Sequence, residues 1–467
     1  MSVTLKFLGG VRTVTGSSHL ISTRHANVLL DCGLFYGPRD EFYKQNTSFK
    51  FNPAKLNAIL LSHAHIDHCG NIPSIIKRGL RCKIYTTTAT RDLCKLMLAD
   101  SGKVQEEDIR YVNKINRQQG QPMRMPLYTM KEGRRAIRKF RPVSYRQKMK
   151  VAKNITASFY DAGHILGSSI IVLDIKRRRA QDLRVGYAVD LGRAGLPLLC
   201  DPTPIEGLDY LVMESTYGGR VHSSIDQAKE KLKDAINRTI ERKGKVIIPS
   251  FALERAQEII YFLNELIKDK EIPAIPIYVD SPLTTNVTEV FRTHYGYFKE
   301  ETREMMRSKK AGPFDFVNLN YIYNRAVSKA LNNDNRPMII IAGSGMCEAG
   351  RVLHHLKNGI SESKNTVIVV GYMAENTLGK RIVNRERYVR IYGVTKELNA
   401  EVVVINAFSR HADKNELCDY VKTCMPIKKV FIVHGDRDQS QSIHDLLKES
   451  GVDAHLPEKN EQVTLVS

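Results

Sequence analysis

The chain has 467 residues, 42% hydrophobic and 26% charged, which is ordinary for a globular protein of two or three domains. Lysine and arginine number 71 against 50 aspartate and glutamate, a net charge of +21 that favours nucleic acid as a partner. The eight cysteines are scattered without a C-x-x-C pair, and no apolar leader or run of about 18 apolar residues is present. These features argue against a disulfide framework, a zinc knuckle and a membrane span, and they predict a cytoplasmic protein.

Strands are predicted over residues 3–8 and 17–22, followed by an apolar strand that Asp31 closes before the turn at Gly33. A carboxylate at this position can cap the glycine turn, or it can orient a nearby metal ligand through a hydrogen bond. The residues alone leave both roles open for Asp31.

The densest chemical pattern follows the apolar run 58–61, which is predicted to be a short buried strand. Residues 62–68 read Ser-His-Ala-His-Ile-Asp-His, with three imidazoles and a carboxylate within six positions. On extended backbone His63 and His65 point to the same side, so both can bind one cation. The turn through Asp67 and His68 can serve a second cation. A histidine-rich surface loop is the alternative, but the position directly after an apolar strand favours a metal site.

Helices are predicted over 71–78 and 89–120, with a strand from Lys83 between them. The stretch 131–150 is strongly basic and includes Arg138 and Lys139. Such a run is either a solvated face or a surface that contacts phosphates.

Later strands also end in chemically active side chains. Strand 155–160 leads to His164, strand 183–189 ends at Asp190, and strand 209–213 ends at Glu214. Four apolar strands thus terminate in metal-binding or acid–base side chains, at Asp31, the His63 loop, Asp190 and Glu214. Chance does not readily place all four.

From about residue 220 to 392 strands alternate with helices, which predicts a parallel α/β sheet. The turn 342–346, Ala-Gly-Ser-Gly-Met, opens a helix and can hold a phosphate, but it fits no dinucleotide or P-loop pattern. Candidate substrate contacts lie at the strand ends of this segment: Ser250, Arg255, Ser344 and Arg351. The last segment returns to the first pattern, since strand 401–406 leads to His411 and strand 429–433 ends at His434.

These motifs resemble those of the β-CASP family of metallo-β-lactamase-fold nucleases, which includes RNase J and the endonuclease of mRNA 3′-end cleavage. Residues 63–68, Asp31, His164 and Asp190 match the hydrolase motifs, and Glu214, His411 and His434 match the three additional β-CASP motifs. The resemblance implies an αββα sandwich, residues 1–217 and 393–467, with an inserted β-CASP α/β domain at 218–392. Arg410 replaces a small residue of the family motif. The turn 342–346 lacks the RNase J form, and neither a KH-like extension nor a C-terminal oligomerisation domain is seen, which favours the short two-domain prokaryotic type.

Carried over residue by residue, the resemblance implies two zinc ions, with manganese as the alternative metal. One ion would bind His63, His65 and His164, and the other would bind Asp67, His68 and His434. Asp190 would bind both ions, and Asp31 would orient a ligand without binding metal itself. A hydroxide bridging the ions would attack phosphorus. Asp67, Glu214 and His411 are the implied catalytic residues, and His411, paired with Glu214, would protonate the leaving ribose oxygen.

The predicted activity is therefore endonucleolytic hydrolysis of single-stranded RNA in RNA processing or decay, with no membrane partner and a homodimer left open. A DNA-processing nuclease of the same family would share the motifs. A thioesterase or lactamase would need neither the insertion nor Glu214 and His411. A non-catalytic RNA-processing scaffold would lose metal ligands, and none is missing here.

Overall fold

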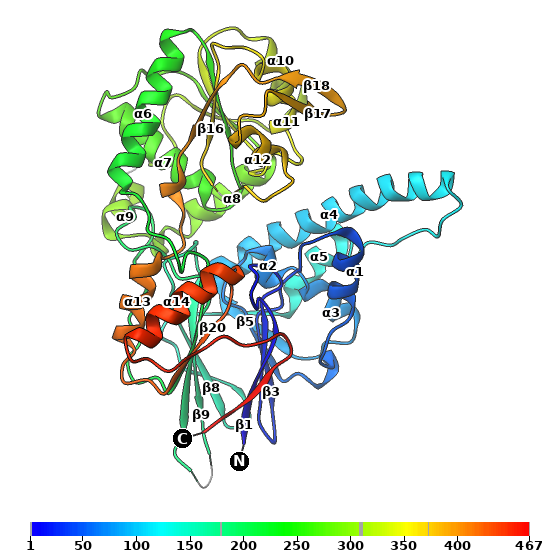
Figure 1. Ribbon diagram of the computed structural model, residues 1–467, viewed down its shortest axis with the longest axis vertical. Coiled ribbons are helices and arrows are strands. Elements are labelled where there is room, and N and C mark those ends of the chain that lie inside the picture. Colours follow the sequence, from blue (N-terminus) through cyan, green and yellow to red (C-terminus); the bar gives the residue numbers. More distant parts are fainter. Residues whose placement is uncertain (1, 178–179, 308–311, 372, 467) are drawn as a thin grey trace. The chain divides into compact units, whose positions relative to one another are not determined.

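The computed structural model describes residues 2–177, 180–307, 312–371 and 373–466, and the chain divides into two compact units (Figure 1). Unit 1 comprises Met1–Gly195, Cys200–Val221 and Arg410–Ser467. Unit 2 comprises Leu196–Leu199 and His222–Ser409. Most of unit 2 lies in the sequence between two segments of unit 1, as expected of an α/β domain inserted into another.

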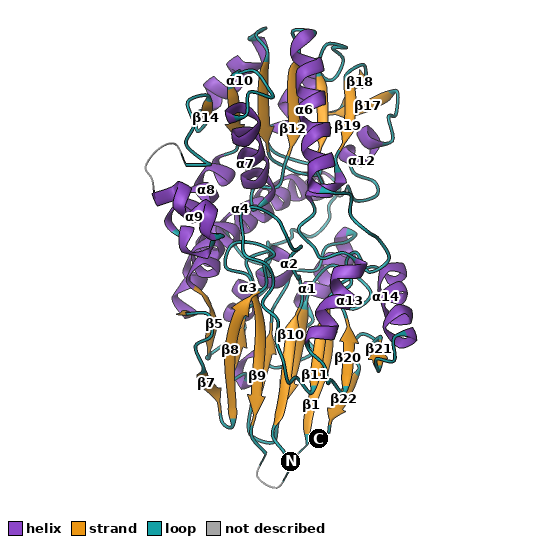
Figure 2. Cartoon of the chain, turned by 90° about the vertical axis from the view of Figure 1, so that its left-hand side faces the viewer, coloured by secondary structure: helices purple, strands orange, loops and turns teal. Residues whose placement is uncertain are grey.

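Unit 1 is built on two seven-stranded sheets. The first has the order β22-β1-β2-β3-β4-β5-β6 and contains β1 (Val3–Gly9), β2 (Ser18–Ser22), β3 (Asn27–Leu30), β4 (Ala58–Leu60), β5 (Lys83–Thr87), β6 (Phe140–Val143) and β22 (Gln462–Leu465). The second has the order β21-β20-β11-β10-β9-β8-β7 and contains β7 (Met149–Ala152), β8 (Ile155–Asp161), β9 (Ser169–Ile175), β10 (Leu183–Ala188), β11 (Tyr210–Met213), β20 (Lys429–Ile432) and β21 (Ala454–His455) (Figure 2).

The two sheets share one core. Phe7 of the first sheet and Phe159 and Tyr187 of the second are fully buried in the same apolar cluster. The C-terminal segment completes both sheets, since β22 pairs with β1 and β20 pairs with β11. Residues at opposite ends of the chain therefore fold as one unit, which explains how ligands from distant segments come together.

Helices cover the outer faces of the two sheets. Their bounds are α1 (Arg39–Thr47), η1 (Pro53–Lys55), α2 (Ile66–Cys69), α3 (Ile72–Lys77), α4 (Thr88–Gln118), α5 (Met130–Ala136), η2 (Ile137–Lys139), α13 (Lys414–Thr423) and α14 (Arg437–Glu449). Leu417 of α13 and Ile443 of α14 pack on the outer face of the second sheet. Asp413 begins α13 with a capping box that includes Glu416, which places the preceding His411 at a fixed point.

Unit 2 has a six-stranded parallel sheet of order β14-β13-β15-β12-β16-β19. Its strands are β12 (Lys245–Pro249), β13 (Ile277–Asp280), β14 (Leu319–Tyr321), β15 (Met338–Ala342), β16 (Thr366–Val369) and β19 (Glu401–Val404), and a separate hairpin joins β17 (Tyr388–Ile391) to β18 (Val394–Glu397). Strand β15 is buried at every position, as expected of a parallel strand covered on both faces.

The helices of unit 2 are α6 (Ile225–Glu241), α7 (Arg255–Lys268), α8 (Pro282–Thr293), η3 (Tyr295–Tyr297), α9 (Glu300–Arg307), α10 (Arg325–Asn333), α11 (Val352–Gly359), α12 (Leu378–Val383) and η4 (Asn406–Phe408). Because β19 pairs with β16, this unit continues as far as Ser409. The domain limits at 217/218 and 392/393 remain predictions. Across the described ranges of both units, none of the helices is both long enough and apolar enough to traverse a lipid bilayer.

Candidate metal centre

The candidate ligands of unit 1 lie on loops at the carboxyl ends of its strands. Asp31 follows β3, residues 63–68 follow β4, and Asp190 follows β10. His164 lies in the turn after β8, and His434 follows β20. Strands β3 and β4 are parallel, as are β10, β11 and β20, so these loops gather at one edge of each sheet.

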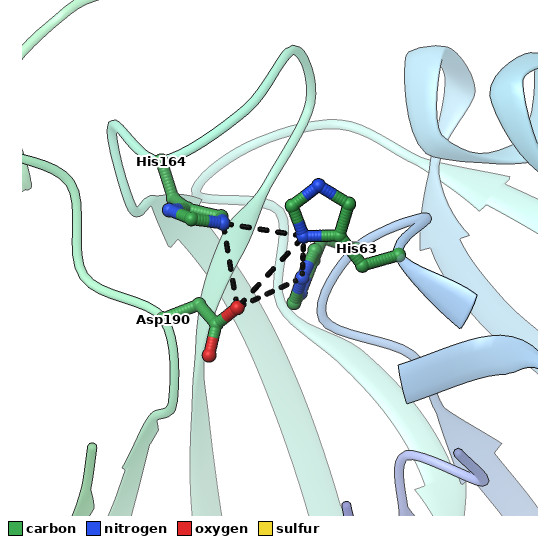
Figure 3. Close-up of side chains that lie close together, drawn as sticks. His63, His164 and Asp190 are labelled. Carbon is green, nitrogen blue, oxygen red and sulfur yellow. Dashed lines mark hydrogen bonds and ion pairs between the residues drawn. The ribbon is translucent and has the colours of Figure 1, made fainter. Parts of the chain in front are cut away.

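The first group of ligand atoms surrounds one oxygen of Asp190 (Figure 3). His63 Nε2 lies 3.1 Å and His164 Nε2 lies 3.3 Å from Asp190 Oδ2. His65 Nδ1 lies 3.1 Å from His63 Nε2 and 3.3 Å from His164 Nε2. These four atoms converge within 4.8 Å of one another, an arrangement that suits coordination of a cation.

The second group faces the other oxygen of Asp190. His434 Nε2 lies 3.2 Å and His68 Nε2 lies 3.5 Å from Asp190 Oδ1. Asp67 Oδ2 is 3.8 Å from His434 Nε2 and 3.9 Å from His68 Nε2. The two carboxylate oxygens of Asp190 therefore face different groups, which is the geometry of a residue shared between two cations.

The chemistry of these side chains fits divalent cations. Burial lowers the pKa of His63 to about 4 and that of His164 well below its ordinary value, and the neutral imidazole is the form that binds metal. Burial also lowers the pKa of His68, but Asp190, Asp67 and Asp31 outweigh it and raise that pKa to about 10. The same carboxylates would stabilise a bound cation.

Two buried atoms that face the second group give a further test of fit. Within the described part of the chain, His68 Nε2 and Asp190 Oδ1 have no hydrogen-bond partner. A buried polar atom left unsatisfied costs about 1–3 kcal/mol, so such atoms normally have a partner. A divalent cation coordinated by both would remove that cost.

Asp31 contacts two of these candidate ligands, His68 directly and His63 through Ser62. Its Oδ2 lies 2.7 Å from His68 Nδ1, and its two oxygens accept hydrogen bonds of 2.7 Å from the amide and hydroxyl of Ser62. Ser62 Oγ lies 2.9 Å from His63 Nδ1, and the Tyr187 hydroxyl donates to Asp31 Oδ2 at 3.0 Å. These contacts favour the orienting role for Asp31 over a cap of the glycine turn. Sequence reasoning missed Ser62 and Tyr187, because a serine and a buried strand tyrosine carry no signal of their partners.

Backbone conformation at the strand ends is unusual. Asp31, Asp190 and His434 all have positive φ, at 57°, 58° and 46°. Non-glycine residues in this left-handed region cost roughly 1–3 kcal/mol each and cluster at functional sites. Glycine permits close approach beside them, since a Cβ on Gly33 would lie 1.5 Å from the Asp67 carbonyl oxygen. The loops that carry the ligands therefore pack backbone against backbone.

His411 forms a pair with Glu214 beside the first ligand group. Its Nδ1 lies 3.0 Å from Glu214 Oε2 and 3.2 Å from Oε1, while Glu214 is fully buried and accepts a hydrogen bond from the Leu191 amide. Burial lowers the pKa of His411, but the charge and hydrogen bond of Glu214 outweigh it and raise that pKa to about 9. The pairing with Glu214 therefore favours the protonated imidazole at neutral pH. Its ring lies 4.5 Å from that of His164, centroid to centroid.

The four candidate substrate contacts all belong to unit 2. Ser250 and Ser344 follow the adjacent strands β12 and β15, and Ser344 Oγ accepts hydrogen bonds from the amides of Glu348 and Ala349. Arg255 pairs with Glu258 at 3.1 Å. Arg351 donates to the buried Asp280 at 2.6 Å and to two backbone carbonyls, so it connects elements of the fold whatever else it contacts.

Family models match three stretches of the chain: a metallo-beta-lactamase superfamily domain at residues 20–192, a Beta-Casp domain at 256–382, and a Zn-dependent metallo-hydrolase RNA specificity domain at 395–457. A Thermus thermophilus protein named as a ribonuclease is 34% identical over 97% of this chain and 98% of its own length. An RNase J-like protein of Methanocaldococcus jannaschii is 31% identical over 94% of each chain.

A transcription termination factor, FttA of Lokiarchaeum, is 30% identical over 100% of this chain and 72% of its own length. The crystal structure of an Enterococcus faecalis protein of unknown function matches 100% of both chains with a TM-score of 0.56 at 14% identity, which shows a shared fold alone. The relatives that are at least 30% identical over nearly the whole chain decide the family. This chain belongs to the β-CASP family of the metallo-β-lactamase superfamily, and it is a hydrolase of the nuclease class.

Proposed function

We propose that this protein is a zinc-dependent ribonuclease that cleaves single-stranded RNA internally and leaves 5′-phosphate and 3′-hydroxyl ends. The proposal rests above all on the Asp190 carboxylate, whose two oxygens face two separate groups of ligands beside the Glu214–His411 pair. The relatives named as ribonucleases, the RNA specificity domain and the net charge of +21 support RNA as the substrate.

Five imidazoles and two carboxylates make up the proposed ligand set. Zinc suits such a mixed nitrogen and oxygen set better than magnesium or calcium, which prefer oxygen ligands, and manganese is the second choice. Two such ions, when bound, would supply an activated water and neutralise the charge that develops on the phosphate.

The side chains around this site would orient the reaction and move the proton. Asp67 and Asp190 fix the position of the ligand groups, and Asp31 holds His68 in one orientation. Glu214 occupies Nδ1 of His411, so the proton would leave from Nε2 toward the departing ribose 3′-oxygen. General acid catalysis of this kind contributes roughly 10²–10⁴-fold to the rate.

The cell compartment is also part of the proposal. The eight cysteines all have free thiols, and five of them are buried. Free buried thiols are typical of proteins from reducing compartments, which supports a cytoplasmic setting.

Closed circular RNA distinguishes internal cleavage from attack at an end. The zinc-loaded protein should linearise a single-stranded RNA circle, and the state of the 5′ end of a linear RNA should matter little. His65→Ala protein, prepared in parallel, controls for contaminating nucleases. Release of mononucleotides from 5′-monophosphate ends with circles untouched would overturn internal cleavage, and faster cleavage of a DNA circle of the same sequence would favour a DNA nuclease.

A further inference from the structure

Five large aromatic side chains among the described residues of unit 2 are exposed to solvent, and three of them are Phe251, Tyr388 and Tyr392. Phe251 follows β12, Tyr388 begins β17, and Tyr392 lies in the turn of the β17–β18 hairpin. Their exposed fractions are 42%, 51% and 51%. Exposed aromatic rings that gather on one surface of a protein commonly mark a binding site.

Each of these rings packs against a neighbouring group. A Cβ on Gly345 would lie 2.7–2.8 Å from the Phe251 atoms Cγ, Cδ2 and Cε2. Near-equal distances to three consecutive ring atoms place Gly345 over the ring face rather than at its edge. Tyr392 packs against His354 with 4.9 Å between ring centroids, and the Arg387 guanidinium lies 5.3 Å from the Tyr388 centroid. The partly exposed rings are thus held as rigid platforms.

One loop of unit 2 connects the platforms. Phe251 and Gly345 follow the carboxyl ends of the adjacent strands β12 and β15. The same loop continues to Gly350, whose carbonyl oxygen lies 3.5 Å from the Tyr392 hydroxyl. In open parallel α/β sheets, ligands bind at the carboxyl ends of the strands. Phe251 and the Tyr392 hydroxyl therefore lie beside the edge where a ligand is expected, and Tyr388 lies on the same hairpin as Tyr392.

The charge of this surface suits a polyanion. Residues 380–397 contain six basic and two acidic side chains. On β17 the exposed Tyr388 and Arg390 alternate with buried Val389 and Ile391, so both project from the open face of the hairpin. Within the described ranges, Arg390 has no carboxylate at ion-pair distance, and its Nε donates to the Gly393 carbonyl at 3.3 Å. Its charge is available for phosphate.

We propose that Phe251, Tyr388 and Tyr392, with Arg390, form a stacking track that holds single-stranded RNA on unit 2. Arg387 pairs with Glu397 at 3.3 Å and lies over the Tyr388 ring. Bases would stack on the exposed ring faces, and Arg390 would contact a phosphate between them. The track deepens the proposed ribonuclease function and rests on it for the identity of the nucleic acid. Double-stranded RNA, whose bases are already stacked, would not use it.

Equilibrium binding tests the stacking. The probe is a fluorescent 20-nucleotide oligouridine, added to the zinc-loaded protein in the cold and checked for integrity on a gel. Replacement of one stacking aromatic side chain by alanine weakens binding by roughly 5- to 150-fold. The double variant Y388A/Y392A should therefore weaken binding by at least about 25-fold. Y388F/Y392F, which keeps both rings, should bind as the natural chain does. Tyr295→Ala, at a 37% exposed tyrosine of η3, is the matched control.

Salt dependence tests the phosphate contacts. Arg390→Gln should reduce the slope of log Kd against log salt by about one, because one fewer counterion is released. Lys268→Gln removes the same charge at the exposed end of α7, and it should leave the slope unchanged.

A second measurement covers the case in which a variant fails to fold, which its melting temperature would reveal. Oligouridine carrying 4-thiouridine should cross-link the natural chain within residues 385–397, and absence of such cross-links overturns the track. Equal affinity of folded Y388A/Y392A and the natural chain overturns it as well, even if hydrolysis is intact. If Y388A/Y392A binds more weakly and the cross-links form within residues 385–397, but no RNA is cleaved, then the proposed hydrolysis fails and the track stands. Tighter binding of single-stranded DNA than of RNA of the matching sequence would overturn RNA as its ligand.

Discussion

Asp31 Oδ2 lies 2.7 Å from His68 Nδ1, so a fully buried carboxylate fixes which imidazole nitrogen faces the second ligand group. Loss of such a partner typically weakens metal binding 10- to 100-fold. Asp31→Ala should therefore lower zinc affinity by about that factor, as measured by competition with a coloured chelator. Asp40→Ala, at an exposed carboxylate of α1, is the control. Unchanged zinc affinity in Asp31→Ala would contradict the orienting role.

His65 supplies an imidazole that is 28% exposed, and its Nδ1 faces both His63 and His164. Protein purified without chelator should contain close to two zinc ions per chain by elemental analysis. His65→Ala should lower the zinc content and abolish hydrolysis, because a three-histidine site loses one ligand. His25→Ala, at an exposed histidine, should change neither quantity. Full zinc and full activity in His65→Ala would disprove the ligand assignment.

Two roles compete for His411, because Asp190, Glu214 and His411 also offer ligand atoms within 4.8 Å of one another. As the general acid, His411→Ala should keep both zinc ions and lose roughly 10²–10⁴-fold in rate. Glu214→Gln should lower the rate in the same direction, since it removes the charge that raises the pKa of His411.

Leaving-group chemistry separates these roles. A substrate whose scissile 3′-oxygen is sulfur needs no proton, so it should restore much of the rate lost in His411→Ala. The natural chain must be measured with the same substrate, because sulfur also changes metal affinity. Loss of zinc from His411→Ala, or equal effects of sulfur on both proteins, would rule out the acid.

Asp280 of unit 2 is fully buried and accepts hydrogen bonds from Arg351 at 2.6 Å and Ser328 at 2.5 Å, with His355 Nε2 at 2.7 Å. Burial raises the pKa of this carboxyl, but these three partners outweigh it and lower the pKa below its ordinary value. The stabilisation is present above the unfolded pKa of about 3.9 and is lost as pH falls through the folded pKa.

Asp280→Asn should therefore lower the free energy of unfolding by about 3 kcal/mol at pH 7, measured by urea denaturation. The difference should narrow only below about pH 4, where the Asp280 carboxyl of the natural chain begins to be protonated. Glu375→Gln, at an exposed pair with Lys380, should cost less than about 1 kcal/mol. A difference that narrows already between pH 7 and 5 would contradict the assignment to Asp280.

Local pattern was enough to predict many of the elements. The apolar run 58–61 predicted the strand that became β4, and the run 209–213 predicted β11. The charged helix predicted over 89–120 is α4, which begins at Thr88 because the Thr87 hydroxyl caps it. The loop of residues 63–68 could be recognised because its ligands are close in sequence. His411 and His434 stand alone, and only the resemblance to a family connected them with that loop.

Long-range contacts account for what sequence reasoning missed. Tyr187 reads as one more buried strand residue, and its bond to Asp31 depends on how the two sheets of unit 1 pack. Arg351, predicted as a substrate contact, donates to Asp280, which lies 71 residues away and could not be paired with it from the sequence. The β17–β18 hairpin was not predicted. Its turn at Tyr392 and Gly393 has φ of 50° and 77°, and tyrosine is not among the residues that usually signal such a turn.

The left-handed backbone at Asp31, Asp190 and His434 has a consequence for redesign of the site. At His63 or His65 an engineer who wants another metal can choose among all ligand types. At the three positive-φ positions, glycine adopts the backbone most readily, and asparagine, aspartate and histidine do so more readily than other side chains. A cysteine or glutamate placed there to attract a softer or harder ion would meet a conformational penalty before its coordination chemistry counted. Metal preference in this protein should therefore be altered from the histidine loop, with the strand-end ligands kept as they are.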